Sequence, residues 1–156
     1  MGTLFLLLIL YQIKHLVIDY PLQGTYMLGK FKPGWDWVGP LLAHVALHAV
    51  GTYLIAIWFV GPLFALWLAV IDMLLHGAMD RIKASPNLLG RFKALMYEKP
   101  KVIAALDNWS PVVQQEARDK LFSDKMFWNS LGFDQMIHHL THYLIIFLIM
   151  RYMSAV

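Results

Sequence analysis

The sequence contains no cysteine, and only 15% of its residues are charged. Without cysteine there are no disulfides and no thiolate ligands, so nitrogen and oxygen atoms must hold any metal ion. Such ligands suit Zn²⁺, Mn²⁺ or Fe²⁺ better than Cu⁺ or an iron–sulfur cluster. A soluble domain has about 25% charged residues. With 59% hydrophobic residues, the composition indicates one integral membrane domain over residues 1–156.

Several functional motifs are also missing. The chain has no GxSxG elbow, no P-loop and no dinucleotide fingerprint. Its net charge of +3 comes without a basic run, so we expect no nucleic-acid partner. Membrane lipid is the expected partner, and a homo-oligomer stays open.

Four apolar segments are long enough to cross a bilayer, which takes about 20 mostly apolar residues. They cover residues 3–20, 40–60, 62–80 and 131–153. Val60-Gly61-Pro62 joins the second and third segments in a tight helical hairpin. The sequence therefore predicts an all-α integral membrane bundle of four transmembrane helices.

The stretch 81–130 is polar and is predicted to be a helical cytoplasmic insertion. Ser85-Pro86 and Ser110-Pro111 both have the N-cap and proline of a helix start. This stretch carries nine Lys and Arg residues and loop 21–39 carries two, whereas the hairpin has none. The positive-inside rule then places both loops in the cytoplasm and both termini outside, in a bacterial inner membrane.

Ionisable residues in the apolar segments are spaced four apart, which puts them on one helix face. The sets are His15–Asp19, His44–His48, His76–Asp80 and Asp134–His138–His142. Each set lies toward the predicted cytoplasmic end of its segment, so the four come to one level. Ionisable residues within a span usually face the bundle interior and carry function. The pattern predicts a shared, buried metal site, although any single histidine could instead make an interhelical hydrogen bond.

Nine residues are candidate metal ligands: His15, Asp19, His44, His48, His76, Asp80, Asp134, His138 and His142. One tetrahedral ion takes four ligands, or three with an open catalytic position. Nine candidates therefore suggest two ions, with Zn²⁺ expected before Mn²⁺ or Fe. The catalytic candidates are the carboxylates Asp19, Asp80 and Asp134, which can bridge ions. Two-metal sites favour hydrolysis of phosphate esters.

Three neighbours are predicted to support these ligands. Asp72, one turn deeper than His76, either fixes the tautomer of that histidine or makes a helix–helix hydrogen bond. Gln23 continues the first stripe, and either touches substrate or caps the helix end. His139 points about 100° away from His138 on a helix, and either supports the site or packs.

These motifs resemble a domain-of-unknown-function family of small bacterial and phage membrane proteins. Its pattern of H-x3-D-x3-Q, H-x3-H, H-x3-D and D-Q-x2-H is matched in order by the runs from His15, His44, His76 and Asp134-Gln135. The chain is also similar to inner-membrane proteins described as metal-dependent hydrolases, which distantly resemble zinc-dependent phospholipase C. The resemblance implies a metal-dependent membrane enzyme.

We expect a membrane-embedded, metal-dependent hydrolase that acts on a lipid phosphoester at the cytoplasmic leaflet. Three other classes remain open. The HxxxH and HHxxH spacings also occur in di-iron membrane oxygenases, which generally need more than the seven histidines present. A metal-ion transporter would need polar residues in the outer halves of the helices, which have almost none. The last class is a non-catalytic metal-binding partner protein.

Overall fold

The computed structural model describes residues 2–32, 34–84, 111–123 and 125–155. Every regular element in these ranges is helical: α1 (Gly2–Asp19), the 3₁₀ helix η1 (Met27–Phe31), α2 (Val38–Ala56), α3 (Pro62–Ala84), α5 (Pro111–Ser123) and α6 (Lys125–Met153). The predicted all-α class is thus confirmed for the described residues. Three helices, α1, α2 and α3, are long and apolar enough to cross a membrane. The fourth span stays a prediction, because Asp134, Gln135 and three histidines make the first half of α6 more polar.

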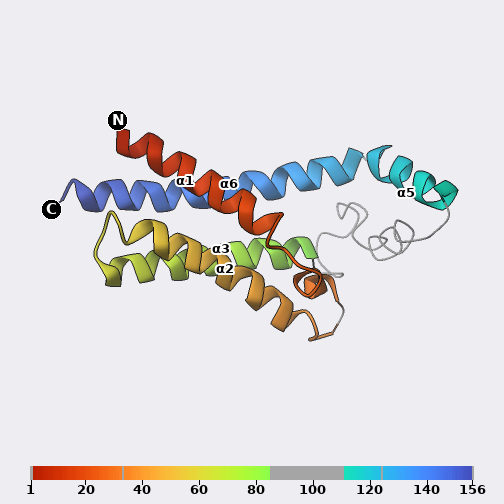
Figure 1. Cartoon of the computed structure of the whole chain (residues 1–156), viewed down its shortest axis with the longest axis horizontal. Coiled ribbons are helices and arrows are strands. Elements are labelled where there is room, and N and C mark those ends of the chain that lie inside the picture. Colours follow the sequence, from red (N-terminus) through yellow and green to blue (C-terminus); the bar gives the residue numbers. More distant parts are fainter. Residues whose placement is uncertain (1, 33, 85–110, 124, 156) are drawn as a thin grey trace.

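The long helices form an up-and-down bundle (Figure 1). α2 and α3 are joined by the short connection 57–61 and make the most extensive helix pair. α3 also packs on α6, and α1 contacts both α2 and α6. The two termini lie at the same end of the bundle as the 57–61 connection (Figure 1). The predicted hairpin between the second and third segments is confirmed.

Prolines mark several helix boundaries. α1 ends at Asp19, just before Pro21, and α3 begins at Pro62, where a missing N–H costs nothing. The helix start predicted at Pro111 is confirmed by α5, whereas the one predicted at Pro86 lies outside the described residues.

The long helices extend beyond the predicted apolar segments on both sides of the stretch 81–130, whose bounds as a cytoplasmic insertion stay a prediction. α3 continues to Ala84, and α6 already begins at Lys125. The hydropathy pattern marks where the apolar part of a helix ends, but the helical hydrogen bonds run on into the polar residues beyond it.

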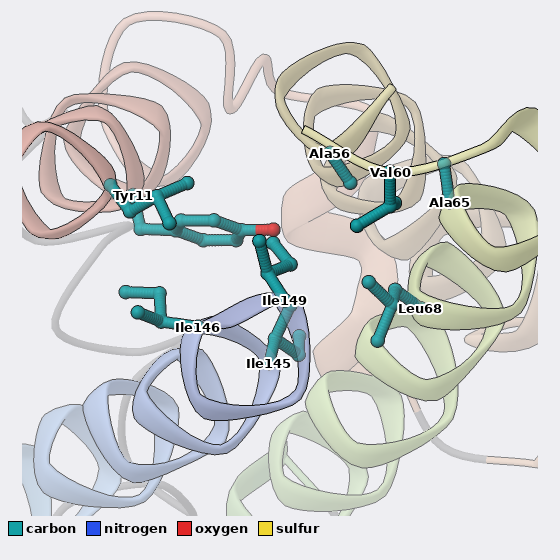
Figure 2. Packing of buried hydrophobic residues seen from close by; sticks show 9 residues of the cluster. Tyr11, Ala56, Val60, Ala65, Leu68, Ile145, Ile146 and Ile149 are labelled. Carbon is teal, nitrogen blue, oxygen red and sulfur yellow. The ribbon is translucent and has the colours of Figure 1, made fainter. Parts of the chain in front are cut away.

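The end of the bundle near the termini is an apolar core (Figure 2). Its buried members come from α1, α2, α3, α6 and the 57–61 connection: Leu7, Tyr11, Ala56, Val60, Ala65, Leu68, Ile145, Ile146 and Ile149. Figure 2 shows Tyr11, Leu68 and Ile149 pointing toward one another from three helices. Small residues such as Ala56 and Ala65 let α2 and α3 approach closely. This core fixes the four helices that carry the polar residues at their other ends.

Candidate metal centre

Six histidines gather inside the bundle next to the apolar core, and all are buried: His15, His44, His48, His76, His138 and His142. Each of the four long helices contributes at least one of them. The rings of His48 and His76 have centroids 3.7 Å apart, and those of His76 and His138 are 3.9 Å apart. The structure therefore brings together sets that the sequence separates by up to 127 residues.

The His and Asp side chains form three overlapping groups whose ligand atoms lie within 4.8 Å of one another. The groups are Asp19/His44/His48/His76, His15/His48/His142 and His76/Asp80/His138. Eight of the nine predicted ligands belong to at least one group. These buried groups could hold a metal ion.

Asp19 lies at the centre of the first group. Its Oδ1 accepts a hydrogen bond from Nε2 of His48 at 2.9 Å and lies 3.4 Å from Nε2 of His44. Its Oδ2 lies 3.2 Å from Nε2 of His15. The Asp19 side chain is 14% exposed, against at most 5% for the histidines around it. Asp19 therefore touches several ligands and also reaches the surface.

Asp80 lies at the centre of the third group. Its Oδ1 is 3.7 Å from Nε2 of His138, and its Oδ2 is 3.3 Å from Nε2 of His44. The same Oδ2 accepts a hydrogen bond from the ammonium of Lys30 at 2.6 Å. Asp80 thus links a histidine of α2 with one of α6 and is held by a lysine from η1.

Asp134 is the predicted ligand that lies outside the three groups found among the described residues. It forms an ion pair with Lys83, and its Oδ1 lies 3.3 Å from Nε2 of His138. The structure thus places Asp134 beside a ligand of the third group.

Lysines are the residues that the sequence reasoning missed. Asp72, Asp80 and Asp134 pair with Lys14, Lys30 and Lys83 respectively. Lys30 belongs to the charged loop 21–39, but its side chain is buried in the cluster. A lysine inside an apolar segment was a usable signal for Lys14, because an ionised group there needs a partner.

Asp72 lies at the deep end of the cluster. Its Oδ2 accepts hydrogen bonds from Lys14 and from Thr52 Oγ1, each at 2.5 Å. The partners come from α1 and α2, so Asp72 makes the helix–helix bond that was one of its two predicted roles.

The remaining predicted neighbours have separate contacts. His139 is half-buried and accepts a hydrogen bond at Nδ1 from Gln12 at 2.9 Å. Gln23 lies in the turn after α1, where its backbone N–H donates to the carbonyl of Tyr20. Gln135, which belongs to the D-Q-x2-H motif but was not a predicted site residue, accepts a hydrogen bond from His15 Nε2 at 3.0 Å. The sequence feature that could have pointed to Gln135 is its position next to Asp134.

The donor atoms fit a metal ion chemically. Several buried ring nitrogens have no hydrogen-bond partner, including both nitrogens of His44 and Nε2 of His76. Buried polar atoms are normally paired, so unpaired ones need an explanation. Neutral imidazole nitrogens and carboxylate oxygens are the ligands that Zn²⁺ takes in proteins. A divalent ion would satisfy these atoms.

Comparisons with protein-family models, with curated proteins and with solved structures give no match for this chain.

Proposed function

We propose that the protein is a membrane-embedded, metal-dependent hydrolase that acts on a lipid phosphoester at the cytoplasmic leaflet. The observation that carries the proposal is the pair of overlapping ligand groups Asp19/His44/His48/His76 and His76/Asp80/His138. The two groups share His76, and we assign it to the second group, which leaves Asp19, His44 and His48 in the first. Each offers three ligands, as catalytic zinc sites do, and so leaves a coordination position for water or substrate.

Charge within the cluster favours an anionic substrate. Four carboxylates (Asp19, Asp72, Asp80 and Asp134) face three lysine ammonium groups (Lys14, Lys30 and Lys83). With neutral histidines, one negative charge remains. Two divalent ions would make the centre strongly positive. In a low-dielectric site this charge attracts a phosphate group.

The position of the cluster along the helices favours a lipid substrate. The more exposed members are Asp19 and Lys83, which lie near the ends of α1 and α3. At the same end of the bundle, the guanidinium of Arg81 lies 3.8 Å from the ring centroid of Trp37. Tryptophan and basic residues are typical of the membrane interface. A phosphoester at headgroup depth can therefore reach the exposed side of the cluster.

The membrane topology is part of the proposal. We infer that α6 is the fourth span, because Ile145 and Ile149 of α6 belong to the same apolar core as α1, α2 and α3. A helix that packs along α1 and α3 shares their surroundings. The charge of the loops then favours cytoplasmic segments 21–39 and 81–130 and external termini, in an inner membrane.

The carboxylates have different roles in the proposed hydrolysis. Bound divalent ions would supply Lewis acidity and a water that ionises near neutral pH. Asp80 and Asp134 are each held by a lysine, which keeps them ionised and oriented. Among the described residues, the ion-pair partners of the Asp19 carboxylate are all histidines. Oδ1 of Asp19 faces the histidines of its ligand set, so we assign Oδ2 the role of accepting the proton of the attacking water.

The test is turnover by the Zn²⁺-loaded protein in mixed micelles. A phospholipid or a lipid-linked phosphate should be cleaved faster than a soluble phosphodiester of the same chemistry. His76→Ala should reduce turnover by more than the about 10–100-fold that is typical of residues supporting a ligand. The matched control is His139→Ala, a histidine outside the three groups, which should keep most of the activity.

One result would replace the proposal. If the metal-loaded protein cleaves neither substrate class, yet moves metal ions across liposomes in a His76-dependent way, the protein is a transporter.

A further inference from the structure

A lysine is fully enclosed at the deep end of the histidine cluster. The side chain of Lys14 is 4% exposed, and its ammonium donates to Asp72 Oδ2 at 2.5 Å and to Thr52 Oγ1 at 3.1 Å. Its third neighbour is Nε2 of His142, at 3.3 Å. An ammonium has three N–H donors and no acceptor. Asp72, Thr52 and His142 therefore satisfy all three donors.

The surroundings are shaped for this side chain. The three acceptors come from three different helices, α3, α2 and α6, while Lys14 comes from α1. Gly51 provides the room, because a Cβ there would lie 2.9 Å from Cγ of Lys14. A side chain at position 51 would thus collide with the stem of the lysine.

We propose that the Lys14 ammonium is a built-in cation that fills a deep cation site formed by Asp72, Thr52 and His142. This site is then closed to metal ions, whereas the histidines nearer the surface stay open to them. The proposal removes His142 from the metal ligands, since its Nε2 accepts a hydrogen bond from the lysine.

Electrostatics explains why the site needs a cation. Asp72 is 0% exposed, and its Oδ1 has no hydrogen-bond partner. A buried carboxylate without a counter-charge is strongly destabilising. Without Lys14, a carboxylate, a hydroxyl and an imidazole nitrogen would surround the vacated position. These are N and O ligands that suit a divalent ion.

The functional consequence concerns the path of metal ions. A fixed cation at this depth repels a second cation that would move from the histidines toward the apolar core. Metal ions would therefore reside in the cluster as cofactors and would not pass through it.

The experiment counts Zn²⁺ per chain in detergent-purified protein by elemental analysis. Lys14→Met keeps the length of the side chain and removes its charge, and should bind one more Zn²⁺ per chain than the wild type. The double variant K14M/D72N removes the carboxylate as well and should return to the wild-type count. If Lys14→Met binds no more Zn²⁺ than the wild type, the proposal is wrong.

A second pair of variants decides the question if Lys14→Met does not fold. His142→Ala should keep the wild-type Zn²⁺ count, because Lys14 holds this histidine, while His48→Ala should lose an ion. Loss of an ion in both variants overturns the proposal. The outcome is separate from the proposed hydrolase activity, because a chain without turnover still gives these differences in Zn²⁺ count.

Discussion

The two ends of the bundle are built from the same helices but contain different kinds of side chain. At the end near the termini, residues 2–13, 49–70 and 143–150 contain no Asp, Glu, Lys, Arg or His. At the other end, the same helices and η1 bring six histidines, four aspartates and three lysines close together, and all of these except Asp19 and Lys83 are buried. The apolar end holds the helices together by packing, and the polar end by specific pairs.

This difference decides which residues can be placed from sequence. Lipid is as apolar as leucine, so an apolar residue gains little by turning inward. Accordingly, Leu68 is buried while Leu66, on the same helix, is 53% exposed. Ionisable residues gain much by turning inward, and their spacing therefore reveals the inner face.

The largest expected effect is a difference in the side of the membrane from which the two ends of the bundle can be labelled. The chain has no cysteine, so single cysteines at Glu116 and Ser154 can be labelled with a membrane-impermeant thiol reagent in oriented vesicles. We expect labelling from opposite sides, with position 116 cytoplasmic. Four spans place both termini on the same side of the membrane, whereas α5 lies between the third and fourth spans and therefore on the other side. The unmodified chain is the control. Labelling of both positions from one side would contradict four spans.

The next largest effect comes from breaking the Lys14–Asp72 ion pair at the polar end. Asp72→Asn leaves the Lys14 ammonium without its counter-charge, and should lower the free energy of unfolding by about 3–5 kcal/mol. Unfolding in mixed micelles of increasing SDS content measures it. Thr52→Val is the control, because it removes a neutral hydrogen-bonding group and should cost about 1 kcal/mol. Equal costs for the two variants would show that the charge pair is not what stabilises this end.

Metal should stabilise the polar end alone. Zn²⁺ at about 100 times its Kd should raise the free energy of unfolding by about 2.7 kcal/mol per ion, and a chelator should remove this gain. His76→Ala should lose most of the gain, whereas Leu68→Ala should keep it in full. A gain that survives His76→Ala would mean that the metal binds elsewhere.

The smallest effects compare two leucines of α3. Leu68→Ala leaves a cavity in the apolar core and should cost about 2 kcal/mol, the low end for a buried leucine because lipid replaces water as the outside solvent. Leu66 is exposed on the outside of the bundle, so Leu66→Ala should change stability by less than about 0.5 kcal/mol. The same SDS titration measures both. A cost for Leu66→Ala as large as that for Leu68→Ala would point to an interface between copies of the chain.

Most of the histidine cluster follows from spacing alone, since i and i+4 residues on apolar helices have only one favourable direction. The lysines do not follow from spacing. Lys30 lies on η1, outside the long helices, and reaches Asp80 through a long flexible side chain. No periodicity links these two residues. Lys83 likewise looks like an interfacial charge until α6 brings Asp134 beside it.

The pairing of Lys14 with Asp72 also bears on the order of events during synthesis. The two residues are 58 positions apart, so α1 leaves the ribosome well before the carboxylate that neutralises its lysine. Until α3 arrives, α1 carries an unpaired charge that opposes its entry into the hydrocarbon. We therefore expect stable insertion of α1 to wait for α3, and a nascent chain arrested within α2 to hold its first helix in the membrane only loosely.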